Sequence, residues 1–380
     1  WGARRATDAV TEEWRGKTWD SQRLSALGAW EMTWGKLLGS TAFAWYGALP
    51  CLVVVALAWP PDWGYSASAV LASAVCGAVG MQAVALITSL TAARKGLLTR
   101  TRGLWVLPLL LGFSGLGSQL STLFNLGVVW WGQHWDGVYF LLASAMLWAA
   151  WAVFGAYRLM CQELQVRTTP WAWTAFLLFL TGYLTGFAVQ LHERQWGFLG
   201  LLTGLLLSGA LTYLMLFSEQ TGALVLRRVW VRVQRQEWRR VLEELPCWPV
   251  SLLLATVCAL LLLLTPPPSG LDLVEDVRDI RLVPLPLLLF LYRDTAIFLG
   301  FSFSQSPRRV EATTLLYLGL LYGIVPGVGW MMGATLLRTL VLPPVFTQPV
   351  FASAVLAVHL LLALSLMAYR WRQSFGVARL

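Results

Sequence analysis

Residues 66–92 read SASAVLASAVCGAVGMQAVALITSLTA, and this stretch holds no charged side chain. About 20 predominantly apolar residues are enough to cross the hydrocarbon core of a bilayer as an α-helix. Further runs long and apolar enough to do so lie at residues 36–59, 104–129, 138–160, 170–191, 195–217, 249–266, 283–304, 313–341 and 350–369. The sequence therefore predicts an all-α polytopic membrane protein with about ten transmembrane helices.

The amino-acid composition supports this prediction. Of the 380 residues, 57% are hydrophobic and 12% are charged, and the mean hydropathy is +0.64, whereas a soluble domain has about 25% charged residues. The net charge of +9 arises mostly from basic residues beside the apolar runs, so we expect contact with anionic lipid headgroups and not with nucleic acid. The five cysteines lie in apolar runs or basic loops, and no disulfide framework is predicted.

Basic residues are distributed unevenly over the gaps between the apolar runs. Twenty-three of the 28 Lys and Arg residues lie in or beside one alternate set of gaps. The other set is short and includes an acidic stretch with Asp272, Glu275, Asp276 and Asp279. Cytoplasmic loops of membrane proteins retain an excess of Lys and Arg. We therefore expect both ends of this chain to lie in the cytoplasm.

Residues 218–248, on the predicted cytoplasmic side, differ from an ordinary loop. Apolar residues cluster near one face of a helix drawn through this segment, and arginines surround the rest. The apolar positions are Leu226, Trp230, Val233, Val241 and Leu245. This pattern predicts an amphipathic helix at the membrane surface. Residues 3–35 are similar in kind but more acidic.

Two short matches indicate an internal repeat. Residues 27–30 read Leu-Gly-Ala-Trp before the run that starts at 36, and residues 245–248 read Leu-Pro-Cys-Trp before the run that starts at 249. Four runs follow each match with the same alternation of sides, but two additional runs precede only the second match. We therefore expect two pseudo-repeated six-helix halves, with the first two helices missing from this chain ahead of Trp1.

The sequence offers no catalytic constellation, cofactor motif or convincing metal site. Residues 35–37 read Gly-Lys-Leu, without the Ser or Thr that follows the lysine in a nucleotide-binding P-loop. His134 and His192 lie in different predicted outside loops, beside Asp136 and Glu193. These four residues are compatible with a cation site, but solvated loop residues are the simpler interpretation.

Arg293 and Asp294 interrupt an apolar run near its middle. Charged side chains inside a membrane are costly unless they are paired or face water, so both are candidate functional residues. Adjacent residues on a helix point about 100° apart, so we expect each to pair with another helix and not with its neighbour. The alternative is that Pro284 and Pro286 open a re-entrant segment, which would place the two charges near an interface.

His359 lies in the middle of the last apolar run. An ionisable group at this depth is a candidate functional residue. The alternative is a neutral imidazole that is hydrogen-bonded between helices.

Residues 12–30 read EEWRGKTWDSQRLSALGAW, and residues 35–39 read GKLLG. These stretches resemble the cytoplasmic signature of type 2 ABC exporter permeases. In that family an E-x-x-x-G-T-x-x-x-L-x-x-x-P-x segment, followed by a G-K-L-L-G helix start, forms the coupling helix between the second and third spans. Here Lys17 separates Gly16 from Thr18, and no proline stands near Gly28. The resemblance covers about 30 residues and agrees with halves of six spans.

The resemblance implies the transmembrane permease subunit of an ATP-driven exporter in the bacterial cytoplasmic (inner) membrane. ATP hydrolysis would then belong to a separate ABC ATPase chain, with membrane lipids and further membrane subunits as other partners. Residues 1–35 would be the coupling segment, 36–160 the first transmembrane half and 161–380 the second. The residues implied to couple to the ATPase are Asp20, Gln22, Arg23 and Trp30 and, by the repeat, Arg239 and Trp248.

Two other functions are compatible with the pattern of spans. A membrane scaffold or anchor subunit of a larger complex would not transport anything, and it would not need two charged segments before similar spans. An intramembrane enzyme would need paired polar residues in neighbouring spans. Apart from Arg293, Asp294 and His359, the runs offer mainly Gln82, Gln119 and Asn125.

Overall fold

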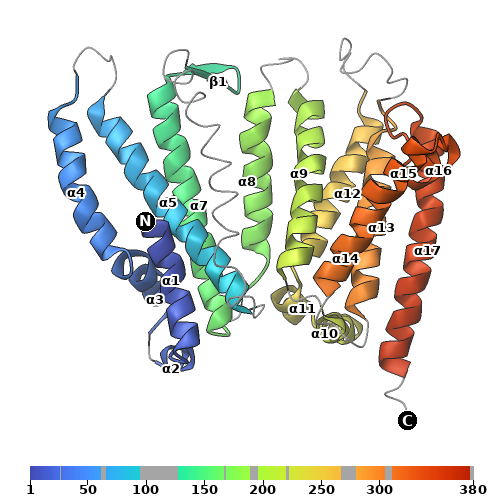
Figure 1. Cartoon of the computed structure of the whole chain (residues 1–380), viewed down its shortest axis with the longest axis horizontal. Helices are drawn as coiled ribbons and strands as arrows, with labels where there is room; N and C mark the ends of the chain where they lie inside the picture. The colour runs from blue at the N-terminus through green and yellow to red at the C-terminus, as the bar shows by residue number, and fades with distance from the viewer. Residues whose placement is uncertain are drawn as a thin grey trace. The chain divides into compact units, whose positions relative to one another are not determined.

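The computed structural model describes residues 1–25, 27–60, 66–94, 127–166, 168–188, 196–219, 222–266, 280–303 and 310–376. These residues form an all-α polytopic membrane fold with one small β-hairpin, which confirms the predicted fold class. The chain divides into two compact units, Trp1–Thr168 and Thr169–Leu380 (Figure 1). Among the described residues, six helices are long and apolar enough to cross a membrane, and eight if each of two bent helix pairs is one span.

The first unit contains the N-terminal polar segment and three long helices. Its elements are α1 (Gly2–Arg15), α2 (Trp19–Arg23), α3 (Ala29–Trp34), the π-helical segment η1 (Gly35–Gly39), α4 (Ala42–Leu57), α5 (Ala67–Arg94), the strands β1 (Val128–Trp130) and β2 (Gln133–Trp135), and α7 (Gly137–Glu163). The strands pair antiparallel, with Val129 opposite His134. Helix α3 begins where the carboxylate of Glu31 accepts a hydrogen bond from the backbone N–H of Gly28, at 2.9 Å.

Helices α5 and α7 pack side by side and run parallel (Figure 1). A Cβ on Gly80 would lie 3.4 Å from the Cα of Ala149, so the small residues of α5 let the two backbones approach closely. At the C-terminal ends of both helices, the guanidinium of Arg94 pairs with the carboxylate of Glu163. Asp136 caps the opposite end of α7, where its carboxylate accepts a hydrogen bond from the backbone N–H of Val138, at 2.9 Å.

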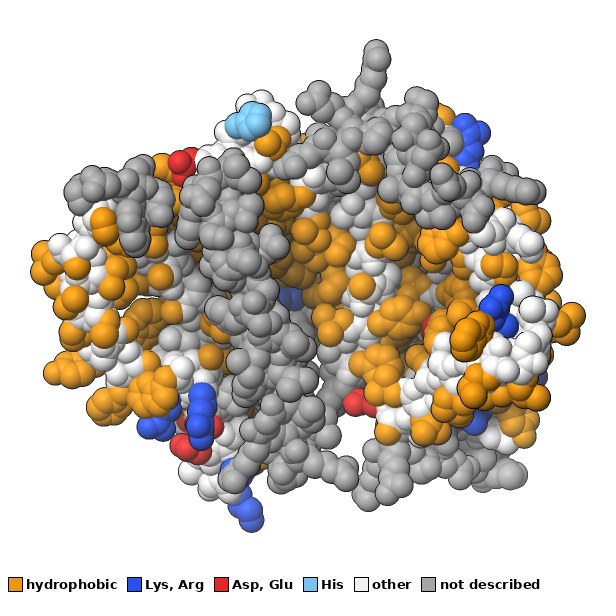
Figure 2. Space-filling model, turned by 45° about the horizontal axis from the view of Figure 1, so that its top comes forward, with side chains coloured by type: hydrophobic (Ala, Val, Ile, Leu, Met, Phe, Trp, Pro, Cys, Tyr) orange, Lys and Arg blue, Asp and Glu red, His pale blue; other side chains and the backbone are white. Residues whose placement is uncertain are grey.

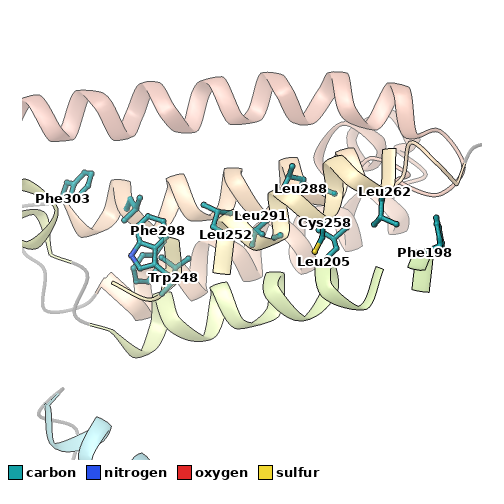
Figure 3. Close-up of a cluster of buried hydrophobic side chains, with 14 residues drawn as sticks. Phe198, Leu205, Trp248, Leu252, Cys258, Leu262, Leu288, Leu291, Phe298 and Phe303 are labelled. Carbon is teal, nitrogen blue, oxygen red and sulfur yellow. The ribbon is translucent and has the colours of Figure 1, made fainter. Parts of the chain in front are cut away.

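The second unit is built from helices of very different length. Its elements are α8 (Trp171–Ala188), α9 (Trp196–Ser218), α10 (Ala223–Gln234), α11 (Trp238–Glu244), α12 (Trp248–Leu264), α13 (Pro284–Ser302), α14 (Val310–Gly319), the π-helical segment η5 (Leu320–Ile324), α15 (Val325–Met331), α16 (Thr335–Val341) and α17 (Pro349–Gly376). Buried side chains from α9, α12 and α13 form its largest hydrophobic core (Figure 3). Figure 2 shows hydrophobic side chains over much of the visible described surface, as expected for helices that face lipid.

Helix α13 is continuous and favours the spanning interpretation of residues 283–304 over the re-entrant one. It covers 19 residues and is apolar enough to cross a membrane. Pro284 and Pro286 occupy its first turn, where the missing N–H of proline costs no helical hydrogen bond. Arg293 and Asp294 therefore lie near the middle of a membrane-length helix.

Three predicted elements have different boundaries in the structure. Residues 218–248 were expected to include one amphipathic helix, but a turn with Gln236 at a positive φ of 57° separates α10 from α11. The predicted run 313–341 ends at Met331, because Gly333 adopts a φ of +65° and turns the chain into α16. Most of the predicted run 104–129 lies outside the described residues, and its last residues belong to β1.

Candidate functional site

The second unit contains a buried charge pair in the middle of α13. The side chains of Arg293 and Asp294 are each 2% exposed. The Nε and Nη2 atoms of Arg293 both lie 2.8 Å from Oδ1 of Asp294. The expectation that these neighbours would not pair with each other was wrong. Their Cβ directions diverge, but the long Arg side chain reaches back to the carboxylate, and burial makes an unpaired charge costly.

Two tyrosines from other elements complete this pair. Tyr213 of α9 donates a hydrogen bond to Oδ2 of Asp294 at 2.8 Å. Tyr322 of η5 donates to the same oxygen at 2.6 Å and accepts from Nη2 of Arg293 at 2.6 Å. Arg293, Asp294, Tyr213 and Tyr322 are called the Arg293 cluster below. The cluster joins α9, α13 and η5 of the second unit, because residues of all three elements form hydrogen bonds with or through the carboxylate of Asp294.

Sequence reasoning missed Tyr213 and Tyr322. Tyrosine is common near the ends of membrane helices, and nothing in its spacing marks one hydroxyl as a partner of a charge. The available signal was indirect, because an intramembrane Asp–Arg pair needs additional hydrogen-bond donors that only polar residues of other runs can supply. Tyr322 also lies in a π-helical segment, a distortion that is frequent at functional sites.

Aromatic rings cover the guanidinium of Arg293 as well. Its Cζ lies 4.7 Å from the ring centroid of Phe290 and 5.1 Å from that of Tyr322. These distances are within the range of cation–π attraction. The remaining nitrogen, Nη1, is buried and has no hydrogen-bond partner among the described residues.

His359 of α17 lies at the depth of the Arg293 cluster. Helices α13 and α17 run parallel, because Ala296 packs near Ala363 and Gly300 lies against Met367. The residue numbers in these two contacts differ by the same amount. The same difference places residue 360, and with it residue 359, beside Arg293. The buried Nδ1 of His359 has no hydrogen-bond partner among the described residues.

The predicted coupling residues Asp20, Arg23 and Trp30 lie on the surface of the first unit. The side chain of Asp20 is 86% exposed and lies 3.7 Å from the guanidinium of Arg23. Trp30 is 52% exposed. Its ring makes edge contacts with Trp34 and Tyr157, at centroid distances of 5.6 Å and 5.4 Å. These contacts leave about half of the Trp30 side chain exposed.

Gln22 points inward from the same short helix. Its side-chain oxygen accepts a hydrogen bond from Nζ of Lys36 at 3.1 Å. Lys36 is buried, pairs with the carboxylate of Glu13, and lies 4.9 Å from the ring centroid of Trp19. Glu13, Trp19, Gln22 and Lys36 are called the Lys36 network below. The sequence indicated Lys36 only as part of a helix start, so its role in tying α1 and α2 to η1 was missed.

The structure separates the two coupling residues predicted from the repeat. The side chain of Arg239 in α11 is 94% exposed and lies 3.6 Å from the carboxylate of Glu243. Trp248, at the start of α12, is 8% exposed and packs in the hydrophobic core with Leu252 and Phe298 (Figure 3). In this conformation Arg239 is available to a partner and Trp248 is not.

The possible cation site lies only partly within the described residues. His134 is exposed on β2, and Asp136 caps α7, whereas His192 and Glu193 lie outside the described residues. The described part of the chain brings no three His, Cys, Asp or Glu side chains together in a way that suits a metal ion. No known family, curated protein or solved structure matches this chain.

Proposed function

We propose that this chain is the transmembrane permease subunit of an ATP-driven ABC exporter and works with a separate ATPase chain in the bacterial cytoplasmic membrane. The observation that carries the proposal is the position of α2, a short helix with exposed side chains. The Lys36 network holds it against η1, which precedes the first apolar helix, α4. The resemblance of residues 12–39 to the coupling signature of such permeases supports the same function.

The exposed face of α2 and α3 has the chemistry of a docking surface. Asp20 and Arg23 present opposite charges that would orient a partner, because charge complementarity steers and selects binding. Trp30, on α3, has about half of its surface exposed. A partly exposed tryptophan is a typical anchor of an interface when a groove on the partner buries it. This surface, defined as Asp20, Arg23 and Trp30, is proposed to receive the ATPase.

The Lys36 network provides a physical link from this surface to the membrane. Gln22 lies on α2, and its bond to Lys36 connects α2 to η1. The segment that ends with η1 meets α4 at a bend of 54°. A movement of α2 would therefore be transmitted through Gln22 and Lys36 to the start of α4, because the amine of Lys36 is buried and the loss of a buried hydrogen bond is costly.

The distribution of charge supports a cytoplasmic position for this surface. Arg94 and Glu163 mark one end of the α5–α7 pair, and Trp19 packs near that end with Ala93 and Met160. Basic residues gather in the segments attached to this end, and the positive-inside rule assigns such segments to the cytoplasm. An ATPase that uses cytoplasmic ATP would meet α2 there.

Site-specific photo-crosslinking tests the proposal. The chain is expressed together with each ATP-binding-cassette protein that its source genome encodes, and a photoreactive amino acid replaces either Arg23 or, as the control, His134 on the exposed hairpin. We expect a crosslink to the ATPase from position 23 and none from position 134. Absence of a crosslink at both positions, with no co-purified ATPase, would refute the assignment. A crosslinked pair that hydrolyses ATP without moving any substrate would favour the scaffold function instead.

A further inference from the structure

The guanidinium of Arg293 has one edge to which no described residue binds. A guanidinium carries five N–H donors. Nε donates to Asp294, and Nη2 donates to Asp294 and Tyr322. The guanidinium also lies over the rings of Phe290 and Tyr322. Nη1, with two N–H donors, has no partner among the described residues although the side chain is only 2% exposed. A buried donor without an acceptor is unfavourable, so this edge favours a ligand that accepts hydrogen bonds.

A second unpaired polar group lies at the same depth. His359 lies on α17, which packs along α13, and its Nδ1 is buried without a partner among the described residues. Among the described residues, the charged groups on the helix packed against α17 are Arg293 and Asp294 of α13, and Tyr213 of α9 and Tyr322 of η5 bind the same carboxylate. Imidazole is the side chain among these whose charge ordinarily changes between pH 5 and 8.

Charge balance determines how a ligand would bind here. Arg293 and Asp294 neutralise each other. An acceptor with a full negative charge would leave the cluster with a net negative charge near the middle of a membrane helix, which is costly. Protonation of His359 would restore neutrality. Anion binding and proton uptake are therefore expected to occur together.

We propose that Nη1 of Arg293 binds a small anionic group and that His359 takes up one proton when this group binds. The ligand is either a free inorganic anion such as chloride or the anionic end of a larger molecule, for example a phosphate diester. Both have the acceptor atoms and the single charge that the open edge of Arg293 requires. The proposal concerns the second unit alone and stands whether or not an ATPase docks on the first unit.

The test uses the purified chain in nanodiscs without any ATPase. In one arm, phosphatidylcholine nanodiscs are titrated with chloride, with gluconate as the replacement at constant ionic strength. In the other arm, chloride-free nanodiscs contain increasing phosphatidylglycerol, which distinguishes a lipid phosphate from a free anion. The thermal unfolding midpoint and the apparent Kd are measured at several values between pH 5.5 and 7.5.

We expect one of the two anions to raise the unfolding midpoint in the wild-type chain. Its apparent affinity should weaken by about tenfold for each pH unit over the range in which the free site has lost the proton. His359→Gln should remove this pH dependence, whereas His134→Gln, on the exposed hairpin, should leave it unchanged. Arg293→Lys should remove anion binding, because a lysine lacks the Nη1 edge, whereas Arg338→Lys should not.

The wild-type measurement alone can overturn the proposal, so the test does not depend on whether a variant folds. Unfolding midpoints that respond to neither chloride nor phosphatidylglycerol would show that this edge holds at most a neutral molecule such as water. Anion binding with the same pH dependence in His359→Gln would refute the role of His359. Unchanged anion binding in a folded Arg293→Lys variant would place the anion elsewhere.

Discussion

Lys36 and Glu13 form an ion pair that joins the first helix of the chain to the π-helical segment η1, although they lie 23 positions apart in the sequence. Lys36 is buried, and Gln22 supplies it with a further hydrogen-bond acceptor. A lysine at the start of an apolar helix would usually extend its amine into water. Here the amine turns into the protein instead, which makes the polar N-terminal segment a packed part of the first unit.

Removal of Lys36 should destabilise the first unit. Lys36→Met leaves the carboxylate of Glu13 without its partner in a site that is only partly exposed. We expect a loss of roughly 3 kcal/mol in the free energy of unfolding, near the lower end of the range for a broken buried pair. Lys17→Met is the matched control, because Lys17 is exposed, and a change below about 0.5 kcal/mol is expected. Denaturant unfolding of the purified chain in detergent measures both, and equal effects would contradict a structural role for Lys36.

Neutralising one member of the Arg293 cluster should be more harmful than removing both charges. Asp294→Asn leaves Arg293 as an uncompensated buried charge, which we expect to cost about 3–5 kcal/mol. The double variant Arg293→Met with Asp294→Leu should recover part of this loss, because two apolar side chains leave no charge to compensate. Thermal unfolding midpoints and the yield of monodisperse protein compare the two. A double variant less stable than Asp294→Asn would contradict this account.

The proposed docking surface should be needed for coupling but not for folding. Arg23→Ala combined with Trp30→Ala removes one oriented charge and the exposed indole without opening the Lys36 network. We expect normal membrane insertion and at least a tenfold loss of ATPase binding, since interface anchors are typically worth 2 kcal/mol or more. Co-purification and substrate-stimulated ATP hydrolysis measure the effect. Arg4→Ala combined with Trp196→Ala removes exposed side chains of the same types elsewhere and should bind normally.

Membrane orientation can be tested by cysteine labelling in intact cells. Starting from a variant without its five cysteines, a single cysteine is placed at Arg235 or at His134. A membrane-impermeant maleimide should modify position 134 and spare position 235 until the cells are opened, because the basic segment around Arg235 is expected in the cytoplasm. Labelling of position 235 alone in intact cells would reverse the proposed orientation.

The candidate site was predictable only in part. Arg293, Asp294 and His359 stood out because charged or ionisable residues are rare inside apolar runs. Their partners did not, since Tyr213 lies 81 residues from Asp294 in the sequence and Tyr322 lies 28 residues away. The predicted coupling residues also have different environments in the structure. Asp20 lies at the surface, Gln22 turns inward and Trp248 is buried in the core.

The sequence by itself determined the membrane-length helices that the structure describes. In a bilayer the backbone must satisfy its own hydrogen bonds, and a run of about 20 apolar residues does so locally by forming a helix, whatever its neighbours are. Side-chain contacts have no such local rule, because they depend on how each helix is rotated and how deep it sits against the next. The tertiary structure alone therefore decided that Tyr213 and Tyr322 meet Asp294 and that Lys36 turns toward Glu13.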